Sequence, residues 1–206
     1  MTDYKANNNM SKFEKLIPFI LYFETGLKRE YLKLPLPEMF AMAKKTGYAN
    51  DPADSGGATM CGVTIATYRA YRKRLGYAST SIDDLKAISF TAWRDILKTM
   101  FWDKWKADRI ENQSVANILV DFVWASGVNG VKIPQRVLDV EADGVVGPVT
   151  LAAVNTHNPE ILFSKLHDAR ICFVEDIVKR KPSQVKFIKG WKRRINCITF
   201  QGLKYE

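Results

Sequence analysis

Hydrophobic side chains recur over most of this chain at the three- and four-residue spacing of one helix face. The first run extends from Phe13 to Phe23. It begins behind Ser11, which with Glu14 forms the pattern of a capping box. This run predicts a helix that ends at Glu24. Later runs predict helices over 65–75, 89–101, 112–126, 161–179 and 187–195, and a further short helix that starts at Ser81. Ser89, Thr91 or both are the expected caps of the helix over 89–101. We therefore expect a mainly α protein, with the most apolar of these helices at its centre.

Residues 47–64 interrupt the helical pattern with a cluster of polar and turn-forming side chains. The turn formers are Asn50, Asp51, Pro52, Asp54, Ser55, Gly56 and Gly57. The two adjacent glycines allow backbone conformations that a side chain would forbid, and an ordered run begins at Val63. We expect a rigid loop or short hairpin that holds Asp54 and Thr59 in fixed places. An ordinary surface turn has the same composition.

Two further segments break the helical pattern. Residues 27–45 contain Pro35 and Pro37, followed by apolar positions at helical spacing. They predict a loop or strand and then a short helix, which is either a flap over a cleft or a surface elaboration. Residues 143–151 predict a turn at Asp143-Gly144, followed by a helix that opens at Gly147-Pro148.

The polar segment 47–64 resembles the signature of glycoside hydrolase family 108, which comprises bacterial and phage N-acetylmuramidases with a lysozyme-like helical domain. In that family Glu-Gly-Gly-Tyr leads directly into the loop. Here Lys45 stands at the glutamate position, and a lysine cannot be the general acid of a glycosidase. Residues 19–26 resemble the end of the family's first helix and put Glu24 in the catalytic place. Because Thr25-Gly26 recurs as Thr46-Gly47, we interpret 27–45 as an insertion.

A second resemblance lies in the C-terminal part of the chain. Residues 143–151 follow Asp-Gly-x-x-Gly-Pro-x-Thr, a signature of predicted peptidoglycan-binding segments. The two resemblances imply a lysozyme-like fold with a small loop or hairpin at the active site. They divide the chain into a disordered lead (1–10), a catalytic region with the insertion (11–126), and a helical peptidoglycan-binding-like region packed on it (127–206).

The resemblance also implies roles for particular side chains. Glu24 is the expected general acid. Asp54 holds and activates water or stabilises the transition state, and Thr59 positions that water. The expected substrate contacts are Tyr48, Asp51, Trp102, Asp121 and Asn129. Three of these have alternatives: Asp51 competes for the role of Asp54 or caps the turn, Trp102 fills the core, and Asp121 has a structural partner.

These roles imply a peptidoglycan hydrolase, expected to cleave the β-1,4 bond between N-acetylmuramic acid and N-acetylglucosamine by general acid catalysis. One alternative is a lytic transglycosylase, in which a single acid performs both proton transfers. The other is a non-catalytic wall-binding or secretion-associated protein, suggested by Lys45 and the insertion. No cofactor or metal is expected, because the potential metal ligands do not cluster along the sequence.

The charge balance narrows the choice of partner. The 206 residues include 31 Lys and Arg but 22 Asp and Glu, which gives a formal net charge of +9. A basic surface suits nucleic acid, an anionic membrane or an anionic polymer. The basic residues are spread along the chain and no nucleic-acid module is recognisable, so the bacterial wall is the expected partner. No apolar run is long enough to cross a bilayer, so stable membrane insertion is not expected.

The cysteines indicate where the chain folds. There are three, an odd number, without a Cys-x-x-Cys pair, which favours free thiols in a reducing compartment over a disulfide framework or zinc site. No signal-peptide pattern is recognisable near the N-terminus. We expect a monomer that is made in the bacterial cytoplasm and acts on the wall, in the periplasm or outside, after release.

Overall fold

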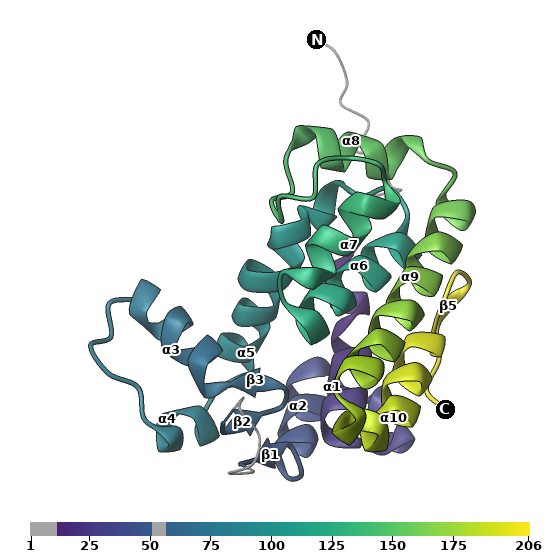
Figure 1. Ribbon diagram of the computed structural model, residues 1–206. Coiled ribbons are helices and arrows are strands. Elements are labelled where there is room, and N and C mark those ends of the chain that lie inside the picture. Colours follow the sequence, from purple (N-terminus) through teal and green to yellow (C-terminus); the bar gives the residue numbers. More distant parts are fainter. Residues whose placement is uncertain (1–11, 51–56) are drawn as a thin grey trace. The chain divides into compact units, whose positions relative to one another are not determined.

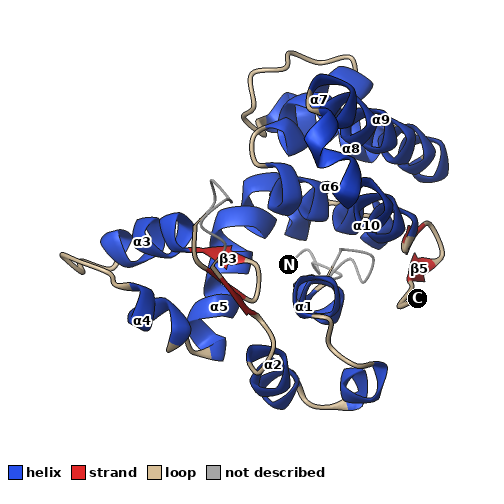
Figure 2. Ribbon diagram, turned by 60° about the horizontal axis from the view of Figure 1, so that its bottom comes forward, coloured by secondary structure: helices blue, strands red, loops and turns tan. Residues whose placement is uncertain are grey.

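The computed structural model describes residues 12–50 and 57–206 and divides them into two compact units. Unit 1 is built on Phe101–Lys204 and includes Phe13, while unit 2 is built on Glu14–Met100 and includes Tyr205. Helices dominate both units (Figures 1 and 2), which confirms the mainly α fold class. The expected lead, 1–10, lies outside the described residues. The predicted domain boundary at 126/127 falls inside unit 1 and stays a prediction.

The first long helix of unit 2 starts later than the apolar pattern predicts. A 3-10 turn, η1 (Phe13–Lys15), precedes α1 (Ile17–Thr25). Pro18 lies in the first turn of α1. The backbone N–H groups there have no partner within the helix, so a proline costs no hydrogen bond. Ser11, the expected cap, lies outside the described residues. The helix ends at Gly26, which adopts the left-handed conformation with φ of 65°.

The expected insertion 27–45 is an ordered pair of helices, η2 (Arg29–Lys33) and α2 (Leu36–Lys44). The first half is therefore a 3-10 helix rather than a strand, and the expected short helix follows it. On α2, Met39, Phe40 and Ala43 are buried. The ring centroid of Phe40 lies 5.4 Å from that of Trp93. The insertion thus contributes to the core of unit 2.

A small antiparallel sheet with the strand order β1-β2-β3 follows α2. Its strands are β1 (Tyr48–Ala49), β2 (Thr59–Met60) and β3 (Val63–Thr64). Strands β2 and β3 are joined by Cys61 and Gly62, whose φ angles are 48° and 79°. Two positive φ angles in a two-residue loop define a type I′ turn, which matches the twist of a hairpin.

Three helices complete unit 2, and each starts at a hydroxyl cap. They are α3 (Ile65–Arg74), α4 (Ile82–Lys86) and α5 (Phe90–Ile96). Thr64 caps α3, Ser81 and Asp84 form a capping box on α4, and Ser89 caps α5. The caps at Ser81 and Ser89 agree with the sequence pattern, because a capping hydroxyl acts only on the turn that follows it.

Unit 1 is organised around α6 (Gln113–Ser126), which the apolar pattern predicted and which contributes ten buried residues. Helices α7 (Asn129–Val137) and α9 (Pro159–Arg180) pack against it, and α10 (Val185–Asn196) packs on α9 (Figures 1 and 2). Gly130 allows a close contact of α7 with α6, since a Cβ there would lie 2.4 Å from the backbone of Val123.

The remaining elements of unit 1 are short, apart from α8. They are η3 (Leu97–Trp102, a π-helix that starts in unit 2), η4 (Asp103–Trp105), η5 (Ala107–Arg109), α8 (Pro148–Thr156), η6 (Pro182–Gln184), β4 (Ile198–Thr199) and β5 (Gly202–Leu203). Helix α8 opens at Gly147-Pro148 as predicted. In the described part of the chain, no helix is both long and apolar enough to cross a membrane.

Candidate active site

Glu24 lies in the last turn of α1 and is half-buried. Its carboxyl group lies against the hairpin turn, because a Cβ built on Gly62 would be 2.7 Å from Cδ and Oε2 of Glu24. Gly62 therefore has two functions: it adopts the positive φ of the turn, and it leaves the space that the carboxyl group occupies. The structure thus brings the expected acid to the β2–β3 hairpin.

The two Thr-Gly pairs of the sequence lie together in space. The Thr46 hydroxyl donates a hydrogen bond to the carbonyl of Thr25 at 2.8 Å, and the amide of Cys61 donates to the carbonyl of Gly47 at 2.8 Å. A Cβ on Gly47 would lie 2.6 Å from the sulfur of Cys61. The chain that leaves the end of α1 at residue 26 therefore returns to the same place at residue 46.

Lys45, which stands at the family's glutamate position, is exposed at the C-terminal end of α2. Its neighbour Lys44 donates a hydrogen bond from Nζ to the carbonyl of Ile88 at 2.9 Å. In unit 2 the helix-end carboxylate that lies against the hairpin is thus supplied by α1, not by the residue directly before the loop.

The turn that supports Glu24 is anchored by Cys61, which is fully buried. The indole of Trp93 donates to the carbonyl of Cys61 at 2.9 Å. Burial raises the pKa of the Cys61 thiol to about 12; nearby Lys44 lowers it and Glu24 raises it by smaller amounts. The thiol is therefore neutral at physiological pH and is not a nucleophile. The sequence predicted a rigid loop or short hairpin in 47–64 but not the position of this turn, although Gly62 between Met60 and Val63 is a hairpin signal.

The pairing of the strands determines on which face of the small sheet Thr59 lies. Thr59 pairs with Ala49 and Thr64, whereas Met60 pairs with Tyr48 and Val63. Because Met60 and Val63 are buried and strand side chains alternate, Thr59 and Thr64 lie on the opposite, half-exposed face. The Thr64 hydroxyl accepts a hydrogen bond from the amide of Thr67, so it is used as a helix cap.

Of the other residues expected around the loop, only Tyr48 lies within the described part of the chain. Asp51 and Asp54 lie outside the described residues. Tyr48 is 37% exposed on β1, and Nζ of Lys86 lies 5.0 Å from its ring centroid. An exposed aromatic ring on the edge strand of this sheet is available for stacking on a sugar.

Two expected substrate contacts in unit 1 are corrected by burial. Trp102 is 0% exposed, donates from Nε1 to Asp108 at 2.7 Å and packs edge-on against Phe13. Asp121 is also 0% exposed and is held by Arg170 at 2.5 Å and Arg194 at 2.7 Å. Both side chains have structural roles, because neither reaches a polysaccharide from these positions.

The charge of Asp121 is fixed by its partners. Burial alone would raise the pKa of this carboxyl group, but the charges of Arg194 and Arg170 outweigh burial and lower the pKa. Asn129, the remaining expected contact, is exposed at the start of α7. It lines a groove of about 520 Å³ that also includes Arg136 and Arg180.

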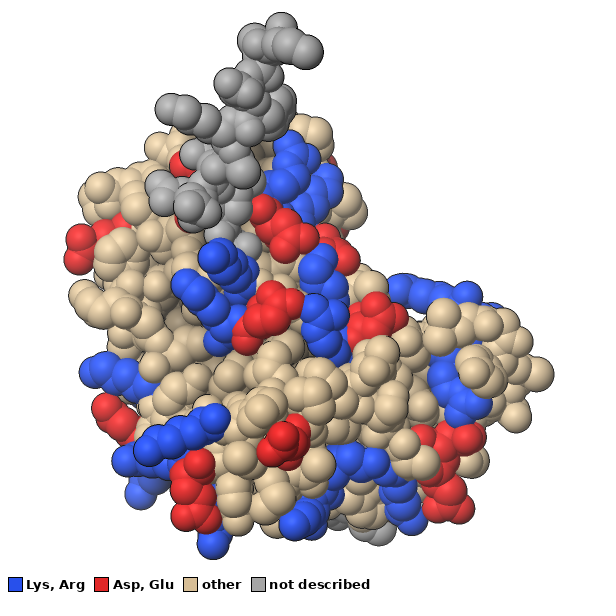
Figure 3. All heavy atoms as spheres, turned by 180° about the vertical axis from the view of Figure 1, so that it is seen from behind, with Lys and Arg blue, Asp and Glu red and all other residues tan. Residues whose placement is uncertain are grey.

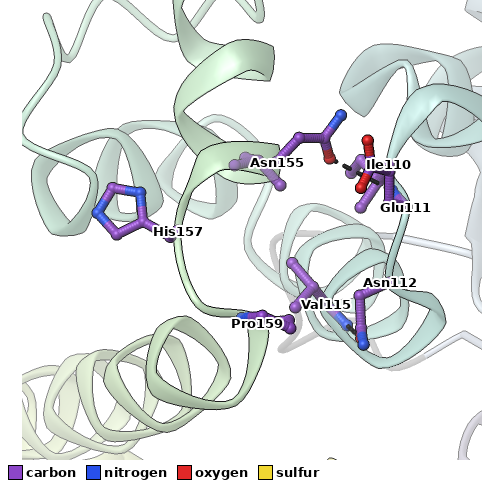
Figure 4. A pocket seen from close by; sticks show the side chains of 8 residues that line it. Ile110, Glu111, Asn112, Val115, Asn155, His157 and Pro159 are labelled. Carbon is purple, nitrogen blue, oxygen red and sulfur yellow. Dashed lines mark hydrogen bonds between the residues drawn. The ribbon is translucent and has the colours of Figure 1, made fainter.

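A separate pocket of about 210 Å³ lies beside the start of α6 (Figure 4). Asn155 points toward the backbone of Glu111, from which its Oδ1 accepts a hydrogen bond at 3.3 Å. The side chain of Asn112 accepts from the first turn of α6, and Nδ1 of His157 lies 2.7 Å from the carbonyl of Ala153. These polar groups are used to join elements of unit 1.

Neither the distribution of surface charge nor the potential metal ligands indicate a stronger candidate for the functional site. On the face drawn in Figure 3, Lys and Arg side chains lie among Asp and Glu rather than gathering in one patch. No group of three or more His, Cys, Asp or Glu side chains within residues 12–50 and 57–206 is arranged to hold a metal ion. The end of α1 and its hairpin are therefore the best candidate site.

Comparisons with known proteins identify the family of the chain rather than single site residues. The sequence profile of glycosyl hydrolase 108 matches residues 39–127, and that of a predicted peptidoglycan domain matches residues 129–196. Glu24 precedes the first match, whereas Lys45 lies within it. No curated protein matches the chain.

Among solved structures, that of Brucella abortus SagA is similar over 90% of each chain, with 30% sequence identity and a TM-score of 0.70. This similarity extends well beyond the segment covered by either profile alone. It confirms the family resemblance that the two sequence signatures indicated. The chain therefore belongs to glycosyl hydrolase family 108, and its activity is that of a glycoside hydrolase acting on peptidoglycan.

Proposed function

We propose that the protein is a muramidase: it cleaves the β-1,4 bond between N-acetylmuramic acid and N-acetylglucosamine, with Glu24 as general acid. The observation that carries this proposal is the contact of the Glu24 carboxyl group with Gly62. It brings a helix-end glutamate to the hairpin that follows the family's loop motif, although the segment 27–45 and the loop lie between them in the sequence.

The reaction needs a proton donor and a water molecule or anion on the other side of the sugar ring. Glu24 donates its proton to the glycosidic oxygen, so that one sugar leaves as an alcohol. A water molecule adds to the anomeric carbon, and its proton goes to Asp54, which we assign as the base. Thr59 lies on the half-exposed face of the hairpin and positions this water. We propose inversion, by analogy with phage-type lysozymes.

Two other functions are separable from this one. A lytic transglycosylase would form a 1,6-anhydro sugar without consuming water. A non-catalytic wall-binding protein is favoured by one observation, Lys45 in place of the family's glutamate. The contact between Glu24 and Gly62 favours an enzyme over a wall-binding protein, because it supplies the glutamate that Lys45 replaces in the family motif.

The test is clearance of purified peptidoglycan by the full chain, followed by mass analysis of the products. A hydrolase gives fragments one water heavier than those of a transglycosylase. Glu24→Gln should lower the rate about a hundredfold or more, because general acid catalysis is lost. The matched control is Glu38→Gln, an exposed glutamate on α2, which should clear the wall like wild type. If Glu24→Gln retains more than about a tenth of the activity, the acid is another residue.

We also propose that the protein folds in the cytoplasm, works as a monomer and reaches the wall after release. The three cysteines support the first point, since all are free and two, Cys61 and Cys197, are buried as thiols. Fractionation of producing cells with an antibody, and light scattering of the purified chain, test the location and the oligomeric state separately.

A further inference from the structure

The excess of positive charge in this chain is concentrated in one segment near the C-terminus. Residues 177–205 contain nine Lys or Arg side chains and no Asp or Glu. The remaining 22 Lys and Arg side chains equal the 22 Asp and Glu in number. Basic residues therefore occur along the whole chain, but the net charge of +9 belongs to this segment, which includes the end of α9, η6 and α10.

Part of this charge is used within the fold. Five of the nine side chains have a carboxylate or carbonyl partner: Lys179 and Arg180 at Asp176, Lys192 at Glu175, Arg194 at Asp121, and Arg193 at the carbonyl of Glu206. Three others, Lys181, Lys186 and Lys189, are exposed, and within residues 12–50 and 57–206 none of them forms an ion pair. We call these three the turn lysines. Their charge is available to a partner outside the chain.

The turn lysines lie where the chain reverses between two packed helices. Lys181 directly follows α9, η6 forms the reversal, and α10 then packs back along α9 (Figure 1). Lys186 and Lys189 are three positions apart on α10, so they are neighbours on one face of that helix. The uncompensated charge is therefore gathered at one end of a helix pair, residues 181–189, which we call the α9–α10 turn.

Apolar side chains are exposed at the same turn. Val185 is 58% and Phe187 44% exposed, on either side of Lys186 in the sequence, and Pro182 is exposed as well. No other phenylalanine among residues 12–50 and 57–206 is exposed. Phe187 is held in place by stacking on Trp191, with 5.9 Å between the ring centroids, and Nζ of Lys186 lies 4.9 Å from its ring centroid. The turn thus presents hydrocarbon and cations together.

We propose that the α9–α10 turn binds the surface of an anionic phospholipid bilayer. The turn lysines meet the headgroup phosphates, because basic clusters are attracted to anionic leaflets. Val185 and Phe187 enter the boundary between headgroups and acyl chains, where apolar and aromatic side chains of surface-bound proteins lie.

Other polyanions fit this surface less well. A phosphate polymer would meet the turn lysines but would leave Val185 and Phe187 in water. A single-stranded nucleic acid is usually bound by a series of stacking rings along a groove, whereas this turn exposes one ring. Binding at the bilayer surface needs no spanning helix, which agrees with the absence of one from the described part of the chain.

The experiment measures co-flotation of the full chain with vesicles of phosphatidylglycerol and phosphatidylcholine, and with vesicles of phosphatidylcholine alone. The anionic vesicles should bind at least about tenfold more tightly at low salt. Replacing the three turn lysines by Gln should weaken this binding at least about tenfold. The matched control removes the same charge from exposed positions elsewhere, by Lys33→Gln, Lys73→Gln and Lys165→Gln, and should weaken it less than about threefold. Neither lipid has a glycosidic bond, so the result is independent of Glu24.

A second variant separates the bilayer from a soluble polyanion. Phe187→Ser should weaken vesicle binding at least about threefold at both low and high salt, because salt does not screen apolar burial. Leu75→Ser, at a residue 57% exposed after α3, is the control and should bind like wild type.

Three results would overturn the site: no preference for anionic vesicles, equal losses from the two lysine triples, or unchanged vesicle binding by Phe187→Ser. Inorganic polyphosphate or a single-stranded DNA that binds more tightly than the vesicles, and equally to wild type and Phe187→Ser, would overturn the bilayer as the partner.

Discussion

Two carboxylates in the two units have opposite surroundings. Glu24 is half-buried at a helix end and lies against a glycine whose missing side chain makes room for it. Asp121 is fully buried in the middle of a helix and is held by two arginines. The arginines fix the charge of Asp121 and block any other contact. The glycine leaves Glu24 in contact with the turn of the β2–β3 hairpin. The same chemical group is structural in one place and suited to chemistry in the other.

The largest expected effect is the loss of stability when the buried ion cluster around Asp121 is broken. Asp121→Asn removes the charge that compensates Arg170 and Arg194 while keeping the size of the side chain. Loss of one partner from a buried ion pair should lower the free energy of unfolding by about 3–5 kcal/mol, measured by urea denaturation. Asp176→Asn removes an exposed carboxylate on α9 and should change it by about 0.5 kcal/mol at most. Equal effects of the two substitutions would contradict a structural role for Asp121.

The space beside Glu24 is tested by Gly62→Ala. The added Cβ would overlap the Glu24 carboxyl group, so the acid has to move. A misplaced catalytic group should reduce the rate of wall clearance about a hundredfold. Gly76→Ala is the control: Gly76 has a similar positive φ of 88°, but a Cβ there meets nothing within 4 Å.

Both alanine variants should therefore lose similar stability, about 1–2 kcal/mol each for the left-handed backbone. Only Gly62→Ala should lose activity. If the two variants lose activity in parallel, Gly62 matters for the turn alone and does not position Glu24.

A smaller difference between wild type and Asp121→Asn is expected in the stability of the fold at low pH. The pKa of Asp121 is lowered in the folded protein, so its ionised form stabilises the fold above the unfolded value of about 4. That contribution is lost as the pH falls below 4 toward the folded value. The urea midpoint of wild type should therefore decrease between pH 5 and the lowest pH at which the chain stays folded, while that of Asp121→Asn should decrease less. Parallel pH profiles would mean that Asp121 does not contribute to acid unfolding.

The smallest effect is expected at Lys45. Lys45→Glu restores the residue of the family motif, but at an exposed position at the end of α2. The variant should not exceed wild type in wall clearance, because Glu24 already supplies the carboxylate. A clear gain of activity would instead identify Lys45 as a damaged catalytic position and contradict the role of the insertion.

The sequence predicted features that depend on neighbouring residues. The central helix 112–126, the caps at Ser81 and Ser89, and the helix opening at Gly147-Pro148 all follow from patterns a few residues long. The start of α1 was misplaced, because an apolar pattern does not distinguish a 3-10 turn from the first turn of an α-helix.

Features that depend on distant residues were harder to predict. Asp121 and Arg170 are 49 positions apart, so nothing local indicates that they form a pair. An apolar run shows that Trp102 lies near a core but not that Asp108 accepts its indole hydrogen. The position of Glu24 was inferred from a family resemblance. The contact with Gly62 that supports it could not be read from spacing.

The hydrogen bond between Thr46 and Thr25 has a consequence for how such a chain can be shortened. The segment from Leu27 to Gly47 begins and ends at the same place in unit 2. A chain without it would have the sequence Glu-Thr-Gly-Tyr before the loop. That reading is one substitution away from the family's Glu-Gly-Gly-Tyr. Yet Phe40 within this segment packs against Phe90 and Trp93, so excision would produce the family-like motif and remove part of the core at the same time.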